Sequence, residues 1–160
     1  MLTMDPVEQV YRTHHQRLWR GLLAYSGDPD IATDAAAETY AQALARGDAL
    51  TNPEGWIWQT AFRVAAGMLS DRSQWLAITP GGADRSAGSR HHSVQFDQPL
   101  AEFLDQLGSL SDQQRTIVVL RYAGGYTPAD IAEILGTSAN VVRVQLHRAH
   151  AHLRERIGRT

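Results

Sequence analysis

Hydrophobic side chains recur every three or four residues along most of the chain, which is the period of an amphipathic helix. The pattern predicts one helix from residue 5 to about residue 26 and a second from residue 28 to about residue 46. A third apolar block, rich in aromatic side chains, begins at residue 52 and ends near residue 76. No segment alternates strictly between apolar and polar positions, so no strand is predicted.

Capping residues mark the ends of these helices. Aspartate followed by proline at residues 5–6 and 28–29 places a hydrogen-bond acceptor before a proline, a combination favoured at helix starts. Asn52 precedes Pro53 in the same way before the third helix. Gly27 ends the first helix, since glycine readily takes the left-handed conformation common at helix C-termini.

The helical period is lost over residues 76–98, where glycine, proline, serine and charged residues follow no pattern. Such a composition is typical of a flexible linker. Helical signals then return, with a capping box at residues 111–114 and Thr127 as the cap of a short helix. We therefore predict an all-α protein of two small helical domains, residues 1–75 and 99–160, joined by a flexible linker.

The last two predicted helices form a helix-turn-helix pattern. Gly136 separates them and permits the positive φ that a tight turn between helices needs. Ala132, four residues earlier, is small enough for two helices to cross closely. An apolar stripe at spacings of 4, 3 and 4 is expected to bury one side of the final helix, and it comprises Val142, Leu146, Ala149 and Leu153.

The stripe leaves the N-terminal half of the final helix facing outwards. A recognition helix reads base edges in the major groove with its N-terminal residues, where arginine pairs with guanine and asparagine with adenine. The alternative is a plain helical hairpin whose arginines form a solvated face. The candidate DNA-binding residues are Thr127, Ser138, Asn140, Arg143, Val144, His147 and Arg148.

Charge is distributed unevenly along the chain, which matters more than the net charge of −2. Residues 1–76 carry six arginines against nine carboxylates, a net charge of −3. Residues 138–160 carry five arginines against one carboxylate, a net charge of +4. The candidate recognition helix therefore lies in the electropositive part of the chain, as DNA binding favours.

Composition excludes several other classes of protein. The chain has no cysteine, hence neither disulfides nor thiolate metal sites. The histidines of the last helix diverge around it without a cluster of carboxylates, so no metal and no cofactor are predicted. No nucleophile–base pair or phosphate-binding loop is recognisable, so no enzyme is predicted. No apolar run resembles a membrane span or a signal peptide, and we expect a soluble, cytoplasmic protein that binds no membrane.

Three segments resemble RNA polymerase sigma factors of the extracytoplasmic-function (ECF) type. The segment GDPDIATDAAAETYAQAL resembles the region 2 helix of that family, and NPEGWIWQTAFRVA resembles the start of its promoter-melting helix. The segment from Leu110 to Arg154 is similar to region 4 at almost every position. In that family, region 2 binds the polymerase clamp and melts the downstream promoter element, while region 4 binds the upstream element and the polymerase flap.

The resemblance implies roles for residues of the first domain. Asp34, Glu38 and Thr39 match the clamp-binding face of the region 2 helix, and the alternative for these carboxylates is a solvated helix face. Trp56 and Trp58 are two residues apart, so at most one is expected to be well buried in the same place, leaving the other to stack on an unpaired base. The implied downstream-element residues are Asp48, Leu50, Asn52, Trp56, Trp58 and Arg63.

Several positions depart from the family pattern. Ala37 replaces the usual glutamine of the clamp-binding face. The melting segment keeps only Arg63 and Arg72 as basic residues, and Gln145 and His150 replace residues of region 4 that are usually arginine. Since phosphate contacts contribute salt-dependent affinity, we expect modest DNA binding by the chain alone and inefficient strand separation.

The resemblance implies a transcription initiation factor that binds core RNA polymerase and directs it to specific promoters. One alternative is a stand-alone helix-turn-helix regulator that has lost promoter melting, which the low basic content of residues 56–76 favours. Another is an interaction protein whose domains bind polymerase or an inhibitor and never touch DNA. The implied partners are core RNA polymerase and promoter DNA, and the sequence leaves an anti-sigma factor open as a third.

Overall fold

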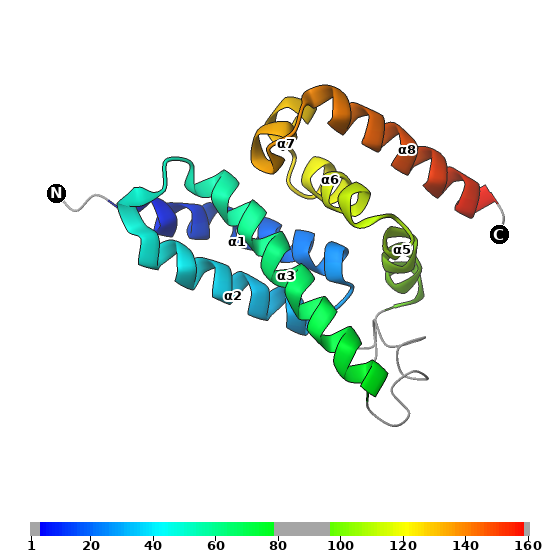
Figure 1. The fold of residues 1–160 in the computed structure, drawn as a ribbon, viewed down its shortest axis with the longest axis horizontal. Helices are drawn as coiled ribbons and strands as arrows, with labels where there is room; N and C mark the ends of the chain where they lie inside the picture. Colours follow the sequence, from blue (N-terminus) through cyan, green and yellow to red (C-terminus); the bar gives the residue numbers. More distant parts are fainter. Residues whose placement is uncertain (1–3, 79–96, 159–160) are drawn as a thin grey trace.

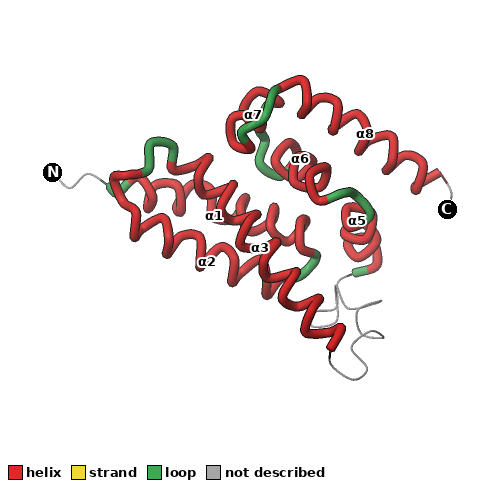
Figure 2. The backbone as a smooth tube through the Cα atoms, in the orientation of Figure 1, coloured by secondary structure: helices red, strands yellow, loops and turns green. Residues whose placement is uncertain are grey.

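The computed structural model describes residues 4–78 and 97–158, and every regular element in these two ranges is a helix (Figures 1 and 2). The prediction of an all-α fold is therefore confirmed. The predicted linker lies mostly at residues 79–96, outside the described residues. The elements are α1 (Pro6–Ser26), α2 (Pro29–Arg46), the short 3-10 helix η1 (Gly47–Ala49), α3 (Pro53–Ile78), α5 (Gln98–Gly108), α6 (Asp112–Tyr122), α7 (Pro128–Leu135) and α8 (Ala139–Gly158).

Side chains cap these helices where the sequence predicted caps. The carboxylates of Asp5 and Asp28 each accept a hydrogen bond at 2.8 Å from the backbone N–H two residues later. At the start of α6, Ser111 and Gln114 form a reciprocal capping box. Gly27 follows α1 with a φ of 70°, the left-handed conformation predicted for it. These bonds satisfy backbone groups that a helix end otherwise leaves unpaired.

The first block, α1 to α3, is a bundle of three helices around one core (Figure 1). Its largest fully buried side chains come from α1 and α3 and include Leu18, Leu22, Tyr25 and Trp58. The helix α2 contributes mainly buried alanines, which let it approach its neighbours closely. Fully burying a large apolar side chain contributes about 1.5–3 kcal/mol, so packing rather than helix propensity holds this block together.

The second block, α5 to α8, builds a core of branched aliphatic side chains. Ile117, Leu120, Ile131 and Val142 are all 0% exposed and come from α6, α7 and α8. The helix α5 adds Leu107, which is 3% exposed, to this core. This arrangement leaves α8 at the outside of the molecule (Figure 1).

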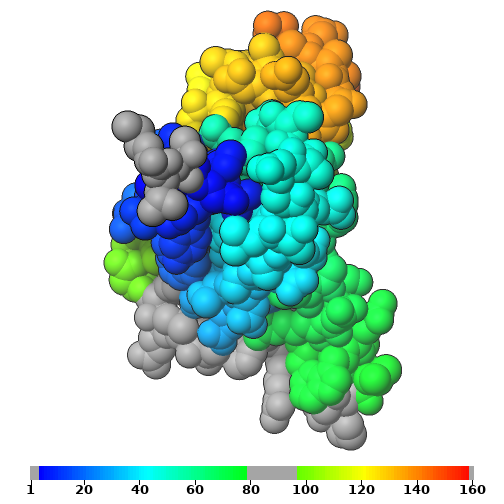
Figure 3. Space-filling model, turned by 90° about the vertical axis from the view of Figure 1, so that its left-hand side faces the viewer, coloured from blue at the N-terminus to red at the C-terminus, as the bar shows by residue number. Residues whose placement is uncertain are grey.

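The two blocks also pack against each other, with α1 and α3 facing α5, α6 and α7. Buried side chains from both blocks form one continuous apolar cluster. In the space-filling view the second block, yellow and orange, rests directly on the blue and cyan first block (Figure 3). Independent folding of residues 1–75 and 99–160 stays a prediction.

Candidate nucleic-acid interface

The turn between α7 and α8 is held by hydrogen bonds of its own residues. Gly136 ends α7 with a φ of 70°, in the left-handed region that glycine tolerates. The backbone N–H of Thr137 donates to the carbonyl oxygen of Ala132 at 2.9 Å. The Ser138 hydroxyl accepts a hydrogen bond from the backbone N–H of Val141 at 3.2 Å and so caps α8. These contacts hold α7 and α8 as a helix-turn-helix.

The apolar stripe predicted on the last helix is buried. Val142 and Ala149 are 0% exposed and Leu146 is 8% exposed, while Leu153 is partly buried against the same cluster. Ala132 of α7 is buried too, consistent with its predicted place in the packing of the two helices. The prediction of the stripe is therefore confirmed, and the stripe determines which face of α8 points outwards.

The opposite face of α8 is open to solvent along its N-terminal half. Its candidate residues recur three or four positions apart and therefore share one face. Residues 139–150 contain no carboxylate, and within the described ranges no ion pair engages an arginine of this face. All seven candidate DNA-binding residues lie at exposed positions: Thr127, Ser138, Asn140, Arg143, Val144, His147 and Arg148.

The loop at residues 47–52 joins α2 to α3 and is called here the α2–α3 loop. Asp48 and Asn52 are exposed, and Leu50 is half-buried against the core. The Asn52 side-chain oxygen accepts a hydrogen bond from the backbone N–H of Gly55 at 3.2 Å, so this residue caps α3 as predicted. A Cβ at residue 55 would meet the Asn52 amide at 2.7 Å, so glycine there lets the cap form.

Trp58 is buried and Trp56 is only partly buried, so at most one of the two is well buried, as their spacing predicted. Trp58 is 1% exposed, and its ring lies with centroids 5.9 Å from those of both Phe62 and Tyr126. Its assignment to the downstream element is therefore wrong, because a side chain in the core cannot stack on a base. Trp56 is half-buried, at the edge of the α2–α3 loop.

Arg46, the last residue of α2, is a basic residue of this region that sequence reasoning missed. Its guanidinium lies 5.2 Å from the centre of the Trp56 ring, within reach of a cation–π contact. The residue is exposed and adjoins the α2–α3 loop. Only its position next to that loop could have indicated a role, since no spacing in the sequence links it to Trp56.

The two arginines of α3 have different environments, one exposed and one paired with a carboxylate. Arg63 is exposed and available to a ligand. Arg72 forms an ion pair with the carboxylate of Asp28, whose side chain is only 3% exposed and which also caps α2. Arg72 therefore contributes to the fold of the first block, and the basic surface of α3 is even smaller than the sequence suggested.

The proposed clamp-binding residues of α2 differ in their exposure to solvent. Asp34 and Glu38 are exposed one helical turn apart, and Glu38 accepts a hydrogen bond from the Gln42 amide at 2.9 Å. Thr39 is 0% exposed, since it lies on the side of α2 that faces the core. Its assignment as a direct polymerase contact is wrong for this reason.

Within residues 4–78 and 97–158, no group of three or more histidine, aspartate or glutamate side chains is arranged to hold a metal ion. In those same ranges, no helix is both long enough and apolar enough to span a bilayer.

Comparison with known proteins identifies the family. The family model "Sigma-70, region 4" matches residues 100–153, which include α7, the turn and most of α8. The ECF RNA polymerase sigma factor SigL of Mycobacterium tuberculosis is 31% identical over 155 residues, covering 91% of this chain and 85% of that protein. The RNA polymerase sigma factor SigV of Bacillus subtilis is 29% identical over 140 residues, covering 85% and 81%.

Solved structures show the same fold. The sigma factor RpoE of Bartonella quintana, solved with the anti-sigma factor NepR, matches with a TM-score of 0.71 and 20% identity over 92% of this chain and 94% of that one. CnrH, solved with the cytosolic domain of CnrY, matches with a TM-score of 0.72 and 18% identity over 95% and 87%.

The fold and the open face of α8 thus define a helix-turn-helix transcription factor. The chain belongs to the ECF family of RNA polymerase sigma factors, because a relative of more than 30% identity aligns with nearly all of it. Sigma factors are transcription initiation factors, which agrees with the function inferred from the sequence.

Proposed function

We propose that the chain binds core RNA polymerase and directs it to particular promoters, with each block contacting a different promoter element. The observation that carries this proposal is the exposed, carboxylate-free N-terminal half of α8, held outwards by the buried stripe. A helix-turn-helix places such a face in the major groove. The upstream element is therefore read by α8.

Two arginines of α8 have different tasks in this proposal. Arg143 lies about one turn into the helix, where recognition helices meet base edges, and it reads a base. Arg148 lies further along the same exposed face, where a helix leaves the groove, and it contacts a phosphate. Asn140, near the start of α8, is a second candidate for base reading.

The first block supplies the polymerase contact and the downstream contact. Asp34 and Glu38 form an exposed acidic pair on α2, and they meet a basic surface of the clamp. The α2–α3 loop, with Trp56 beside it, contacts the downstream element. Because Arg63 is the exposed arginine of α3, strand separation by this block relies on the polymerase.

The relatives argue against a stand-alone regulator. The alignment with SigL covers both blocks rather than the helix-turn-helix alone, as expected for a chain that retains polymerase binding. Catalysis belongs to the polymerase in this proposal, and the chain acts in the cytoplasm, where the polymerase works. The anti-sigma factor bound to the similar sigma factor RpoE supports a partner of that class for this chain.

Reconstitution with core RNA polymerase tests the proposal. The holoenzyme is expected to transcribe from a subset of genomic promoters that core enzyme alone ignores. Co-purification without promoter-dependent transcription would instead indicate a pure interaction protein. DNA binding without any association with core polymerase would indicate the stand-alone regulator.

A further inference from the structure

The exposed face of α8 has an apolar residue near its centre. Val144 lies two positions after the buried Val142 and two before the buried Leu146, about half a helical turn from each, so it points away from the core. The residue is 39% exposed. Asn140, one turn earlier, and Arg148, one turn later, are exposed on the same side of the helix. Polar side chains therefore precede and follow Val144 along the face that points outwards.

Packing and helix stability do not account for a valine at this position. Valine is a poorer helix former than alanine or arginine, because its branched side chain restricts rotation about χ1. With more than a third of its surface exposed, Val144 also gains less from burial than the valines and leucines of the core. Single exposed apolar side chains are common on protein surfaces, so exposure alone assigns no role. The position of Val144 on the recognition face is what distinguishes it.

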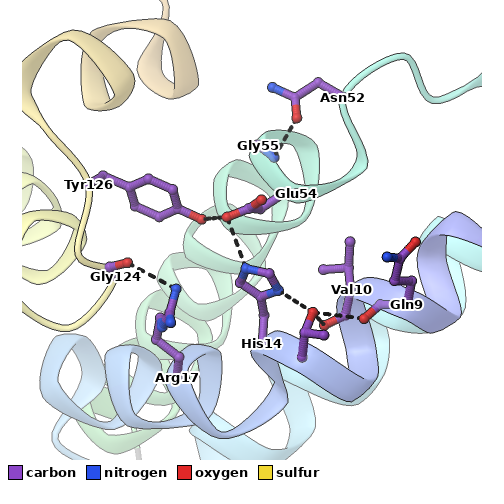
Figure 4. Close-up of polar contacts among 10 residues, drawn as sticks. Gln9, Val10, His14, Arg17, Asn52, Glu54, Gly55, Gly124 and Tyr126 are labelled. Carbon is purple, nitrogen blue, oxygen red and sulfur yellow. Dashed lines mark hydrogen bonds and ion pairs between the residues drawn. The ribbon is translucent and has the colours of Figure 1, made fainter.

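The polar side chains around Val144 are free to meet a ligand. Within the described parts of the chain, no hydrogen bond or ion pair engages the side chain of Asn140 or that of Arg143. Arg17 of α1 shows the opposite situation, because it donates to the carbonyl oxygen of Gly124 at 3.4 Å (Figure 4). The face around Val144 thus keeps its hydrogen-bonding groups available for DNA.

Valine has neither a hydrogen-bond donor nor an acceptor in its side chain, which limits what it can recognise on DNA. In the major groove, base pairs differ in their hydrogen-bonding groups and in one apolar group, the C5 methyl of thymine. A recognition helix brings the residues of its N-terminal half against these base edges. The thymine methyl is therefore the group on a base edge that an outward-facing valine matches. Cytosine, the other pyrimidine, has no methyl group at that carbon, so the contact distinguishes the two bases.

We propose that Val144 determines specificity for a thymine in the upstream element by contacting its C5 methyl group. The proposal rests on the proposed function of α8 as the helix that reads this element. Because one χ1 rotamer dominates for valine in a helix, the methyl groups of the side chain are held in place before DNA binds, and little side-chain entropy is lost. Arg143 reads a different base by hydrogen bonds, so the helix uses two kinds of chemistry at two positions of the element.

Removal of single methyl groups from the DNA tests the proposal with the holoenzyme. The preferred upstream element is first selected from promoter fragments with a randomised upstream region. Each thymine of that element, on either strand, is then replaced by deoxyuridine, which keeps base pairing and lacks only the methyl group. The parent holoenzyme is expected to bind about threefold to fivefold more weakly after one of these replacements, as for the loss of one buried methyl group. The other replacements are expected to have little effect.

Variants of two valines identify the residue that contacts the methyl group. Val144→Ala is expected to bind the thymine and deoxyuridine fragments equally, and Val144→Ile, which keeps an apolar branched side chain, is expected to prefer thymine still. Val141 provides the matched control, since it is 37% exposed on the same helix but directly precedes the buried Val142 and so lies to one side of the face. Val141→Ala is expected to keep the full loss of binding on deoxyuridine. Circular dichroism shows whether each variant is folded.

Three results would overturn the role of Val144. These are a selected element without thymine on either strand, equal binding of thymine and deoxyuridine fragments by the parent holoenzyme, and a methyl preference that survives in folded Val144→Ala. Failure of the proposed function would appear differently, because no upstream sequence would then be enriched at all. Loss of base preference in Arg143→Ala, with equal binding of both fragments by the parent, would leave α8 as the reading helix and remove only the contact by Val144.

Discussion

The long helices α3 and α8 differ in how they divide their surfaces between core and solvent. The helix α8 buries a narrow stripe and leaves an arginine-bearing face exposed along its N-terminal half. The helix α3 buries side chains on several sides, including Ile57, Trp58 and Phe62, and one of its arginines pairs with Asp28. A helix at the edge of a block can expose a whole face to a ligand. A helix that packs on several sides leaves few exposed positions for ligand contacts.

This difference explains why the proposed promoter-contacting surfaces of the two blocks carry unequal numbers of exposed arginines. In the second block, the helix proposed to meet DNA carries arginines on its own exposed face. In the first block, the exposed basic residues described near the proposed contact are Arg46 and Arg63. We therefore expect the first block to depend on the polymerase for its affinity for DNA.

The core role of α3 is tested by replacing Trp56 and Trp58 one at a time. Trp58→Ala is expected to lower the free energy of unfolding by about 3–5 kcal/mol, because it empties a fully buried volume. Trp56→Ala is expected to lower it by less than about 1 kcal/mol, since that ring is only half-buried. Chemical denaturation followed by circular dichroism measures both. Equal losses of stability in the two variants would contradict the contrast drawn between these residues.

The polymerase surface of the first block is tested by reversing two charges on α2. Asp34→Arg combined with Glu38→Arg is expected to weaken binding to core polymerase at least about tenfold, because like charges would then meet across the interface. Helicity and melting temperature should stay near those of the parent, since both residues are exposed. Asp71→Arg, at an exposed position of α3, is the control. Unchanged polymerase binding would leave the pair as a solvated face.

The structural role of Arg72 is tested against that of Arg63. Arg72→Ala is expected to lower the free energy of unfolding by about 1–3 kcal/mol, because it leaves the buried Asp28 carboxylate without this ion pair. Arg63→Ala is expected to leave stability nearly unchanged and to make the salt dependence of DNA binding by the holoenzyme shallower by about one unit. If Arg72→Ala changed the salt dependence without affecting stability, Arg72 would belong to the DNA surface instead.

The recognition face of α8 is tested with two arginine variants in the holoenzyme. Arg143→Ala is expected to cost about 1–3 kcal/mol and to relax the preference at one position of the upstream element. Arg148→Ala is expected to weaken all sequences alike and to make the salt slope shallower by about one unit. A panel of upstream-element variants distinguishes these outcomes. Uniform weakening by both variants, with base preference intact, would assign base reading to another residue, with Asn140 the next to examine.

Local patterns in the sequence determined the helices, their caps and the exposed face of α8. A cap involves residues two or three apart, and a helical stripe involves residues three or four apart, so both are written within a short segment. The turn at Gly136 and the burial of Val142 could be predicted for the same reason. The resemblance of the region 4-like segment depended on these local features, which is why it extended through nearly every position.

Only the tertiary structure decided which of several equivalent residues faces the core. The period of α3 allowed either Trp56 or Trp58 to be buried, and contacts with Phe62 and Tyr126 settled the choice. Arg72 and Asp28 are 44 residues apart, so no local pattern connects them. The contacts between the blocks join residues still further apart in the chain, such as Tyr25 and Asp112. Such pairs form because separate helices pack together, and packing depends on the shapes of whole surfaces rather than on spacing along one helix.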